Sequence, residues 1–364
     1  MTARSERRRM GWPALAAGVL VFVALGVGCS HVGYYVQSAQ GQFEVSARSR
    51  PIAELMADPA TDPKLRARLE TVAAVRAYAS RELALPDNGS YRSYADLERP
   101  FVVWNVFAAE EFSVSAKQWC FPVAGCVGYR GYFAREDAEA FARGLAAEGY
   151  EVYVGGVPAY STLGWFDDPV LNTFVNYPDP ELARLVFHEL AHQVAYVKDD
   201  SAFNESFATA VELEGVKRWL AAGGRSDEYA AFEIAQARRA EFASLVAQYR
   251  AALGAVYRSG APPEAKRAEK ARLYAALQAD YATLKAGWGG FTGYDRFFDG
   301  VNNARLASVA LYNELVPAFQ GLLAAEGGDL GRFYARVKAL AAEPRAERRA
   351  ALARLAPAIA AEPR

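Results

Sequence analysis

The sequence predicts an α+β fold in which a small mixed β-sheet lies beside a pair of helices and precedes a mostly helical half. Three observations carry this prediction. Residues 98–160 contain short runs of β-branched and aromatic side chains, which favour strands. A helix with clear start signals begins near Asp179. Residues 226–259 and 264–286 are long stretches rich in Ala, Arg, Glu and Leu, and the Ser-Gly-Ala-Pro-Pro between them predicts an antiparallel helical hairpin.

Composition limits the classes of partner that the protein can have. The chain has 364 residues, of which 52% are hydrophobic and 13% aromatic, so it can bury a substantial core. Its formal net charge is −1. A chain without excess positive charge has no electrostatic reason to bind nucleic acid, and the sequence therefore predicts no nucleic-acid partner.

The first 29 residues have the features of an export signal. Four arginines among the first nine residues precede a mostly small and apolar segment, residues 14–28. This segment ends in Leu-Gly-Val-Gly-Cys, and a small residue directly before Cys29 resembles the cleavage box of bacterial lipoproteins, in which the cysteine is acylated. The alternatives are an uncleaved membrane anchor and an ordinary signal peptide. Because Ser30 is not the aspartate associated with inner-membrane retention, the lipoprotein interpretation predicts a periplasmic protein anchored by lipid to the outer membrane.

The remaining chain divides into parts with different composition. The pattern predicts a signal with a lipobox-like end (1–29), a tether or start of the fold (30–50), an α+β part with the sheet (51–178), a helix pair (179–222) and a helical part (223–364). Within the α+β part, five residues separate Cys120 from Cys126. In an exported protein such a pair favours a disulfide. The alternative, that one of them is a zinc ligand, stays open from the spacing.

The most informative stretch is Phe-His-Glu-Leu-Ala-His, which ends at His192. A helix advances about 100° per residue, so His188 and His192 lie on one face, one turn apart. Two neutral imidazoles in this arrangement can bind zinc, and Glu189 is close enough to act on a metal-bound water. The chain contains only three histidines, and His31 lies beside the N-terminal apolar segment. A third protein ligand should therefore be a carboxylate or a cysteine.

A second helix supplies the candidate carboxylate. The first helix carries Asp179-Pro180 as cap and first residue, and a polar break after residue 197 precedes a new helix that starts near residues 201–203. Two antiparallel helices across a short turn can bring Glu205 back beside the histidines. The alternative is a surface helix with a hydrogen-bonded pair of histidines and no metal.

These motifs resemble those of known zinc peptidases. His-Glu-x-x-His followed by Asn-Glu-Ser-Phe-Ala (204–208) resembles the gluzincins, zinc peptidases whose third ligand is a glutamate. Together with Trp-Cys-Phe-Pro-Val-Ala-Gly-Cys (119–126), Ala-Tyr-Ser-Thr-Leu-Gly (159–164) and Asn-Asn-Ala-Arg (302–305), they resemble a family of bacterial lipoproteins described as predicted aminopeptidases. The resemblance implies a zincin-like fold and one zinc ion, and assigns the roles as follows: zinc ligands His188, His192 and Glu205, and general base Glu189.

The resemblance also points to substrate-binding residues. In gluzincins an edge strand at about the position of residues 155–164 pairs with the substrate backbone, which implies contacts from Tyr160 and Ser161. The alternative is a connector without a substrate role. Zinc peptidases of this group steady the oxyanion with a downstream tyrosine or histidine, and no histidine follows His192. Tyr312 is the first candidate and Tyr160 the second, and either could equally be a packed core residue.

The sequence thus predicts zinc-dependent hydrolysis of a peptide or protein substrate. Glu189 would take a proton from the zinc-bound water and pass it to the leaving amine. The expected activity is that of an aminopeptidase of the bacterial cell envelope. Two features differ from the large aminopeptidases: only 12 residues lie between His192 and Glu205, and a Gly-x-Met-x-Asn segment is absent. An envelope endopeptidase and a non-catalytic lipoprotein with a structural zinc site therefore remain alternatives.

Overall fold

The computed structural model describes three stretches of the chain, residues 29–121, 125–309 and 315–355. No helix in these stretches is long and apolar enough to cross a membrane. The predicted export signal lies outside them, except for Cys29.

The chain divides into two compact units, residues 1–47 and 48–364. Most of the segment predicted as a tether or start of the fold, residues 30–50, lies in helix α2 (Cys29–Arg48). All other elements belong to the larger unit, and the functional residues identified below lie there.

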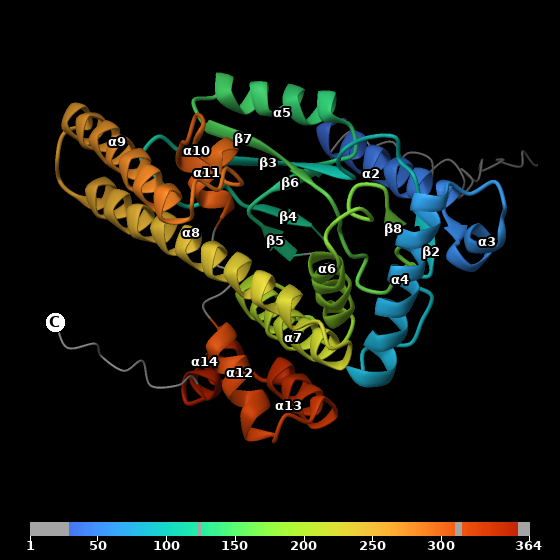
Figure 1. Ribbon diagram of the computed structural model, residues 1–364. Helices are drawn as coiled ribbons and strands as arrows, with labels where there is room; N and C mark the ends of the chain where they lie inside the picture. The colour runs from blue at the N-terminus through green and yellow to red at the C-terminus, as the bar shows by residue number, and fades with distance from the viewer. Residues whose placement is uncertain (1–28, 122–124, 310–314, 356–364) are drawn as a thin grey trace, which may run out of the picture. The chain divides into compact units, whose positions relative to one another are not determined.

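Among the described residues, the larger unit contains three small sheets (Figure 1). The strands that the sequence predicts in one mixed sheet are divided between two of them. The strands are, in chain order, β1 (Arg50–Pro51), β2 (Ser93–Ala95), β3 (Val103–Ala109), β4 (Trp119–Phe121), β5 (Gly125–Val127), β6 (Arg130–Tyr132), β7 (Glu151–Val157) and β8 (Val170–Leu171). In the first sheet, β2 pairs antiparallel with β1 and parallel with β8.

The principal sheet is antiparallel, with β3 between β6 and β7. β7 pairs with β3 over its full length, from Val103 opposite Val157 to Ala109 opposite Glu151. Alternate residues of β3 are buried, among them Val106 and Ala108, which is the pattern of a strand with one face on a core. Helices α5 (Arg135–Ala147) and α11 (Asn303–Ser308) both pack against β3 and β7. β7 is an edge strand of this sheet.

The run of strand-forming residues from 126 to 133 is divided into β5 and β6. The chain turns at Gly128 and Tyr129, so β5 pairs with β4 in a separate hairpin while β6 joins the principal sheet. Cys120 and Cys126 lie opposite each other in this hairpin, and their sulfur atoms form a disulfide. Neither thiol is therefore available as a metal ligand in this structure.

Helices form most of the remaining structure. They are α3 (Ile52–Ala57), α4 (Pro63–Glu82), α6 (Asp179–His192), α7 (Ser201–Ala222), α8 (Ser226–Arg258), α9 (Pro263–Gly287), α10 (Asp295–Phe298), α12 (Val316–Ala325), α13 (Leu330–Ala342) and α14 (Arg345–Ala353). The long hairpin predicted from the sequence corresponds to α8 and α9, which pack along each other (Figure 1). Leu253 and Leu277 are fully buried in its core.

The helix pair α6 and α7 forms the centre of the larger unit, because α4, α8 and α12 pack around it. The two helices approach so closely that a Cβ atom at Gly215 of α7 would lie 2.7 Å from the ring of Phe187 on α6. The turn between them is closed by Asn204. Its side chain accepts a hydrogen bond from the Val197 amide (2.7 Å) and donates one to the Val197 carbonyl (2.8 Å).

One local expectation needs correction. α6 begins at Asp179 itself after Pro178, and the Asp179 carboxylate pairs with Arg68 (2.6 Å) instead of capping the helix. Pro317 lies in the first turn of α12, where a residue without an amide hydrogen is tolerated. Tyr312, the first candidate for steadying the oxyanion, lies outside the described residues.

A buried ion pair ties α14 to the start of α7, and its removal should destabilise the fold. Asp200 caps α7, and its carboxylate lies 2.7 Å from Arg348, with both side chains almost fully buried. Since Asp200→Ala leaves Arg348 uncompensated, we expect it to lower the free energy of unfolding by about 3–5 kcal/mol. Asp62→Ala, which removes only an exposed cap of α4, should cost about 1 kcal/mol.

The pH dependence of the Asp200→Ala effect provides a second criterion. Burial acts to raise the pKa of Asp200, but the hydrogen bond to Arg348 and the charge of Arg349 outweigh it and lower the pKa. The ion pair of Asp200 therefore stabilises the fold fully at pH values above the pKa of Asp200 in the unfolded chain. This stabilisation is lost as the pH falls through the lower pKa of Asp200 in the folded protein. Denaturant unfolding at several pH values should show the difference from wild type shrinking in acid. A small, pH-independent difference would contradict this account.

Candidate metal centre

Three side chains from α6 and α7 meet at one point. His188 and His192 lie one turn apart on α6, and Glu205 lies in the second turn of α7. The Nε2 atoms of the two histidines are 3.2 Å apart. The Glu205 Oε2 atom is 3.2 Å from Nε2 of His188 and 3.7 Å from Nε2 of His192. The structure thus brings together the three residues that the sequence resemblance assigns as ligands.

The chemistry and spacing of these atoms fit a small divalent ion. Two imidazole nitrogens and one carboxylate oxygen form a donor set typical of zinc. A tetrahedral ion with bonds of ~2.0–2.2 Å separates its ligand atoms by about 3.3–3.6 Å, close to the three distances observed. Among the described residues, these three form the one group of His, Cys, Asp and Glu side chains close enough to share an ion.

A fourth residue, Glu212, orients one of the histidines. Its buried carboxylate lies 2.8 Å from Nδ1 of His188 and accepts two hydrogen bonds from Arg184, at 2.9 and 3.1 Å. Because Nδ1 faces a carboxylate, it carries the proton, and Nε2 is left to face Glu205 and His192. Glu212 is not among the residues predicted from the sequence. The signal that could have found it is its spacing, since it follows Glu205 by seven residues, two helical turns, on the same face of α7.

The charges in this cluster shift the pKa values of its members. Burial acts to lower the pKa of His188, but the carboxylates of Glu212 and Glu205 outweigh it and raise the pKa to about 10. Burial lowers the pKa of His192 to about 4, helped by the charge of His188. The pKa values of Glu205 and Glu212 are both lowered, because charged partners outweigh their burial. The site therefore presents two carboxylates that favour a positive charge between them.

Glu189 lies between His188 and His192 in sequence and has a different environment. Burial raises its pKa to about 7, and the negative charges of Glu205 and Asp168 act in the same direction, while His188 opposes them. A carboxyl group with a pKa near neutrality can accept and release a proton at physiological pH. The structure thus gives Glu189 a property that a general base needs.

The loop after β7 contributes a second buried acid. Asp168 is 4% exposed, and its carboxylate accepts a hydrogen bond from the Thr162 amide at 2.9 Å. Burial raises its pKa to about 6. Tyr160 is partly buried, with its ring edge-on to Phe133, and its pKa is raised by burial and by the charge of Asp168. Ser161 also donates to Asp168. Tyr160 and Ser161 therefore both interact with Asp168.

One tyrosine near the ligand cluster was not anticipated. The ring of Tyr196 lies edge-on to His192, with centroids 6.4 Å apart, and the side chain is 38% exposed. Burial and the negative charge of Glu205 raise its pKa, so the hydroxyl stays protonated. The sequence signal was its position, four residues after His192 and therefore close to the turn that carries the two histidines.

A pocket of about 590 Å³ opens beside the ligand cluster. His188, Glu205 and Glu212 lie in its lining, together with Arg184 and Arg239. Glu181 bridges these two arginines, with distances of 2.8 Å to Arg184 and 3.3 Å to Arg239, so that the positive charges of the wall are balanced.

Comparison with known proteins places the chain in a family. The model of a family described as "Putative aminopeptidase" matches residues 33–352. The chain belongs to this aminopeptidase family. The match spans the sheets, the helix pair and the helical hairpin, and it confirms the expected relation to predicted aminopeptidases over most of the chain. No curated protein and no solved structure matches the chain. The family description indicates peptide hydrolysis.

The role of Glu212 can be tested by metal affinity. Glu212→Gln removes the negative charge that holds the His188 ring, and loss of such a partner lowers metal affinity by about 10–100-fold. Titration of the variant with zinc in competition with a chromophoric chelator should show this loss. Glu214→Gln removes the same charge from the same helix, but Glu214 pairs with Arg218, so this control should bind as wild type does. Equal affinities for both variants would contradict the role of Glu212.

Proposed function

We propose that this chain is a zinc-dependent peptidase, an aminopeptidase of the bacterial cell envelope, with one zinc ion held by His188, His192 and Glu205. The convergence of two imidazole nitrogens and one carboxylate oxygen, with Glu189 in the same helical turn, carries the proposal. A purely structural metal site has no use for the carboxyl group of Glu189. Membership of the aminopeptidase family supports a peptide or protein as substrate.

Each residue of this site has its own role in peptide hydrolysis. When bound, zinc supplies a Lewis acid that lowers the pKa of a water toward 7 and polarises the peptide carbonyl. Glu189 takes the proton of the attacking water and passes it to the leaving amine, for which a pKa near 7 is suited. Glu212 holds the ring of His188. Tyr196 donates a hydrogen bond to the developing oxyanion.

The order of elements supports a zincin-like arrangement. An antiparallel sheet precedes α6, which carries both histidines and Glu189, and α7 then supplies the glutamate. β7 is an edge strand and can add an extended peptide by main-chain hydrogen bonds, with Tyr160 and Ser161 just beyond its end. We place the protein in the periplasm, anchored to the outer membrane through acylated Cys29, on the composition of residues 1–29.

Metal content and turnover of two variants test the proposal. Wild type should bind about one zinc per chain and hydrolyse peptides. Glu205→Ala removes a ligand and should lose the metal. Glu189→Gln keeps the ligand set, so it should retain the metal while its kcat falls by about 100-fold or more. Metal analysis and peptide hydrolysis are measured on the same preparations.

Two outcomes of this experiment would contradict the proposal. A well-folded wild type that takes up no zinc would exclude the metallopeptidase. Full activity of zinc-loaded Glu189→Gln would exclude this mechanism. Circular dichroism of each variant checks that the variant is folded, so that a loss of metal can be assigned to the changed ligand.

Tyr196→Phe tests the assignment of the oxyanion donor. Removal of one such donor should lower kcat by about 100-fold with little change in KM, because the interaction forms only in the transition state. Tyr35→Phe, a change at an exposed tyrosine of α2, serves as the matched control and should leave kcat unchanged. Unchanged kcat in Tyr196→Phe, with zinc bound, would remove Tyr196 from the mechanism.

A further inference from the structure

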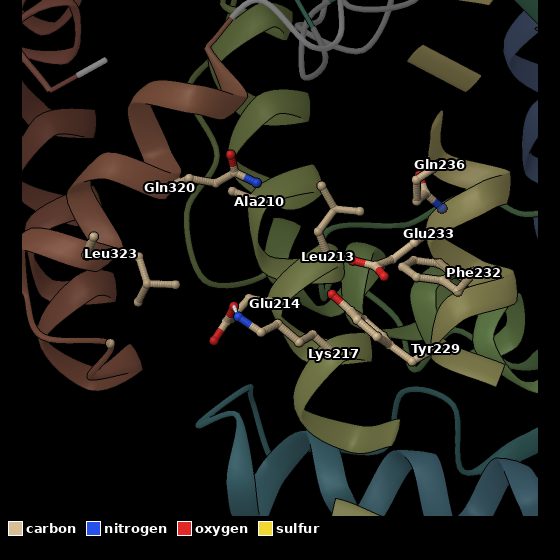
Figure 2. A pocket seen from close by; sticks show the side chains of 12 residues that line it. Ala210, Leu213, Glu214, Lys217, Tyr229, Phe232, Glu233, Gln236, Gln320 and Leu323 are labelled. Atoms are coloured by element: carbon tan, nitrogen blue, oxygen red, sulfur yellow. Dashed lines mark ion pairs between the residues drawn. The ribbon is translucent and has the colours of Figure 1, made fainter. Parts of the chain in front are cut away.

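A second pocket adjoins the metal pocket along α7. Its volume is about 600 Å³, its floor is α7, and its walls are α8 and α12 (Figure 2). Leu213 of α7 and Gln236 of α8 line both pockets. The two pockets therefore adjoin at these two side chains. Together they extend along α7 from Glu205 to Lys217, and we call the pair of pockets the groove.

The groove has the length of a short extended peptide. Glu205 and Lys217 are twelve residues apart on α7, which corresponds to about 18 Å at 1.5 Å per residue. An extended chain advances about 3.3 Å per residue, so about five residues span this distance. A dipeptide bound at the metal centre would leave the second pocket empty.

One polar atom at the junction of the pockets lacks a partner. The Gln236 Nε2 atom is buried and has no hydrogen-bond partner among the described residues, while its Oε1 atom accepts from Arg239 at 3.1 Å. A buried donor without a partner costs free energy. The carbonyl oxygen of a bound peptide can accept this hydrogen bond.

The second pocket has a negative end and apolar walls. Glu214 pairs with Arg218 at 2.7 Å and with Lys217 at 3.8 Å, whereas Glu233 forms no ion pair among the described residues. The Tyr229 hydroxyl hydrogen-bonds to Glu233. Figure 2 shows Glu233 and Tyr229 directed toward Leu213, and the Phe232 ring lies in the same wall. Apolar walls that end in a carboxylate match the methylene stem and charged head of Lys or Arg.

We propose that the substrate is an oligopeptide that runs from the metal centre along α7, and that the second pocket binds a lysine or arginine about five residues beyond the cleaved bond. This inference rests on the proposed peptidase function. An aminopeptidase cleaves after the first residue, so the groove takes the part of the substrate C-terminal to that bond. Substrates of about six residues or more, with a basic residue near the sixth position, are therefore preferred.

The experiment uses the purified full-length zinc-loaded protein and a series of alanine-rich peptides of two to eight residues. We expect kcat/KM to rise by about tenfold once the peptide reaches the second pocket. At the sixth position, lysine should exceed glutamate by about three- to fivefold, the size of a solvent-accessible ion pair. Glu233→Gln should abolish this preference for lysine.

Glu241→Gln is the matched control. It removes the same charge from α8 but lines neither pocket, and its partner is Trp288. The preference for lysine should survive in this variant. Two results would overturn the inference and leave the peptidase function standing. One is an equal preference for lysine in wild type, Glu233→Gln and Glu241→Gln, and the other is a kcat/KM that does not depend on peptide length.

A separate readout covers the case in which no peptide is hydrolysed, which would count against the peptidase function. Fluorescence anisotropy then measures binding of fluorescein-labelled octapeptides with lysine or glutamate at the sixth position. Tighter binding of the lysine peptide to wild type and to Glu241→Gln, but not to Glu233→Gln, supports the pocket. Equal binding of both peptides by all three proteins overturns it.

Discussion

The close packing of α6 against α7 is the constraint on which the rest of the site depends. Ligands on one helix are placed by helical geometry, but a ligand on a second helix is placed only as accurately as the two helices are held together. Asn204 closes the connecting turn with two hydrogen bonds to Val197. Gly215 allows the ring of Phe187 to lie against the backbone of α7. Glu205 follows Asn204 directly, so the residue that closes the turn also sets the position of the third donor.

Buried ion pairs connect the packed helices to the histidine His188. Glu212 reaches His188 from α7, Arg184 of α6 neutralises Glu212, and Glu181 joins Arg184 to Arg239 of α8. Burying a carboxylate is costly unless it is paired, and each acid in this chain of contacts has a partner. The arrangement links three helices by ion pairs and leaves Nε2 of His188 directed at the donor cluster.

α7 serves two purposes along its length. Glu205 and Glu212 face α6, while other residues between Ala210 and Lys217 line the second pocket. A single helix therefore carries both the proposed metal ligand and the floor of the second pocket. For the oligopeptide that we propose as substrate, the rise of α7 would set the preferred length.

The sequence by itself determined the features that depend on short-range geometry. Spacing within one helix placed His188, His192 and Glu189 together, and the long runs of helix-forming residues predicted the hairpin of α8 and α9. Only the tertiary structure decided how elements distant in sequence meet. It placed Glu212 against His188 and Arg184 against Glu212, placed Tyr196 against His192, and divided the strands of the expected sheet between two sheets. The physical reason is that such contacts depend on how closely helices and strands pack, and that spacing follows from the burial of many side chains together, which no local pattern records.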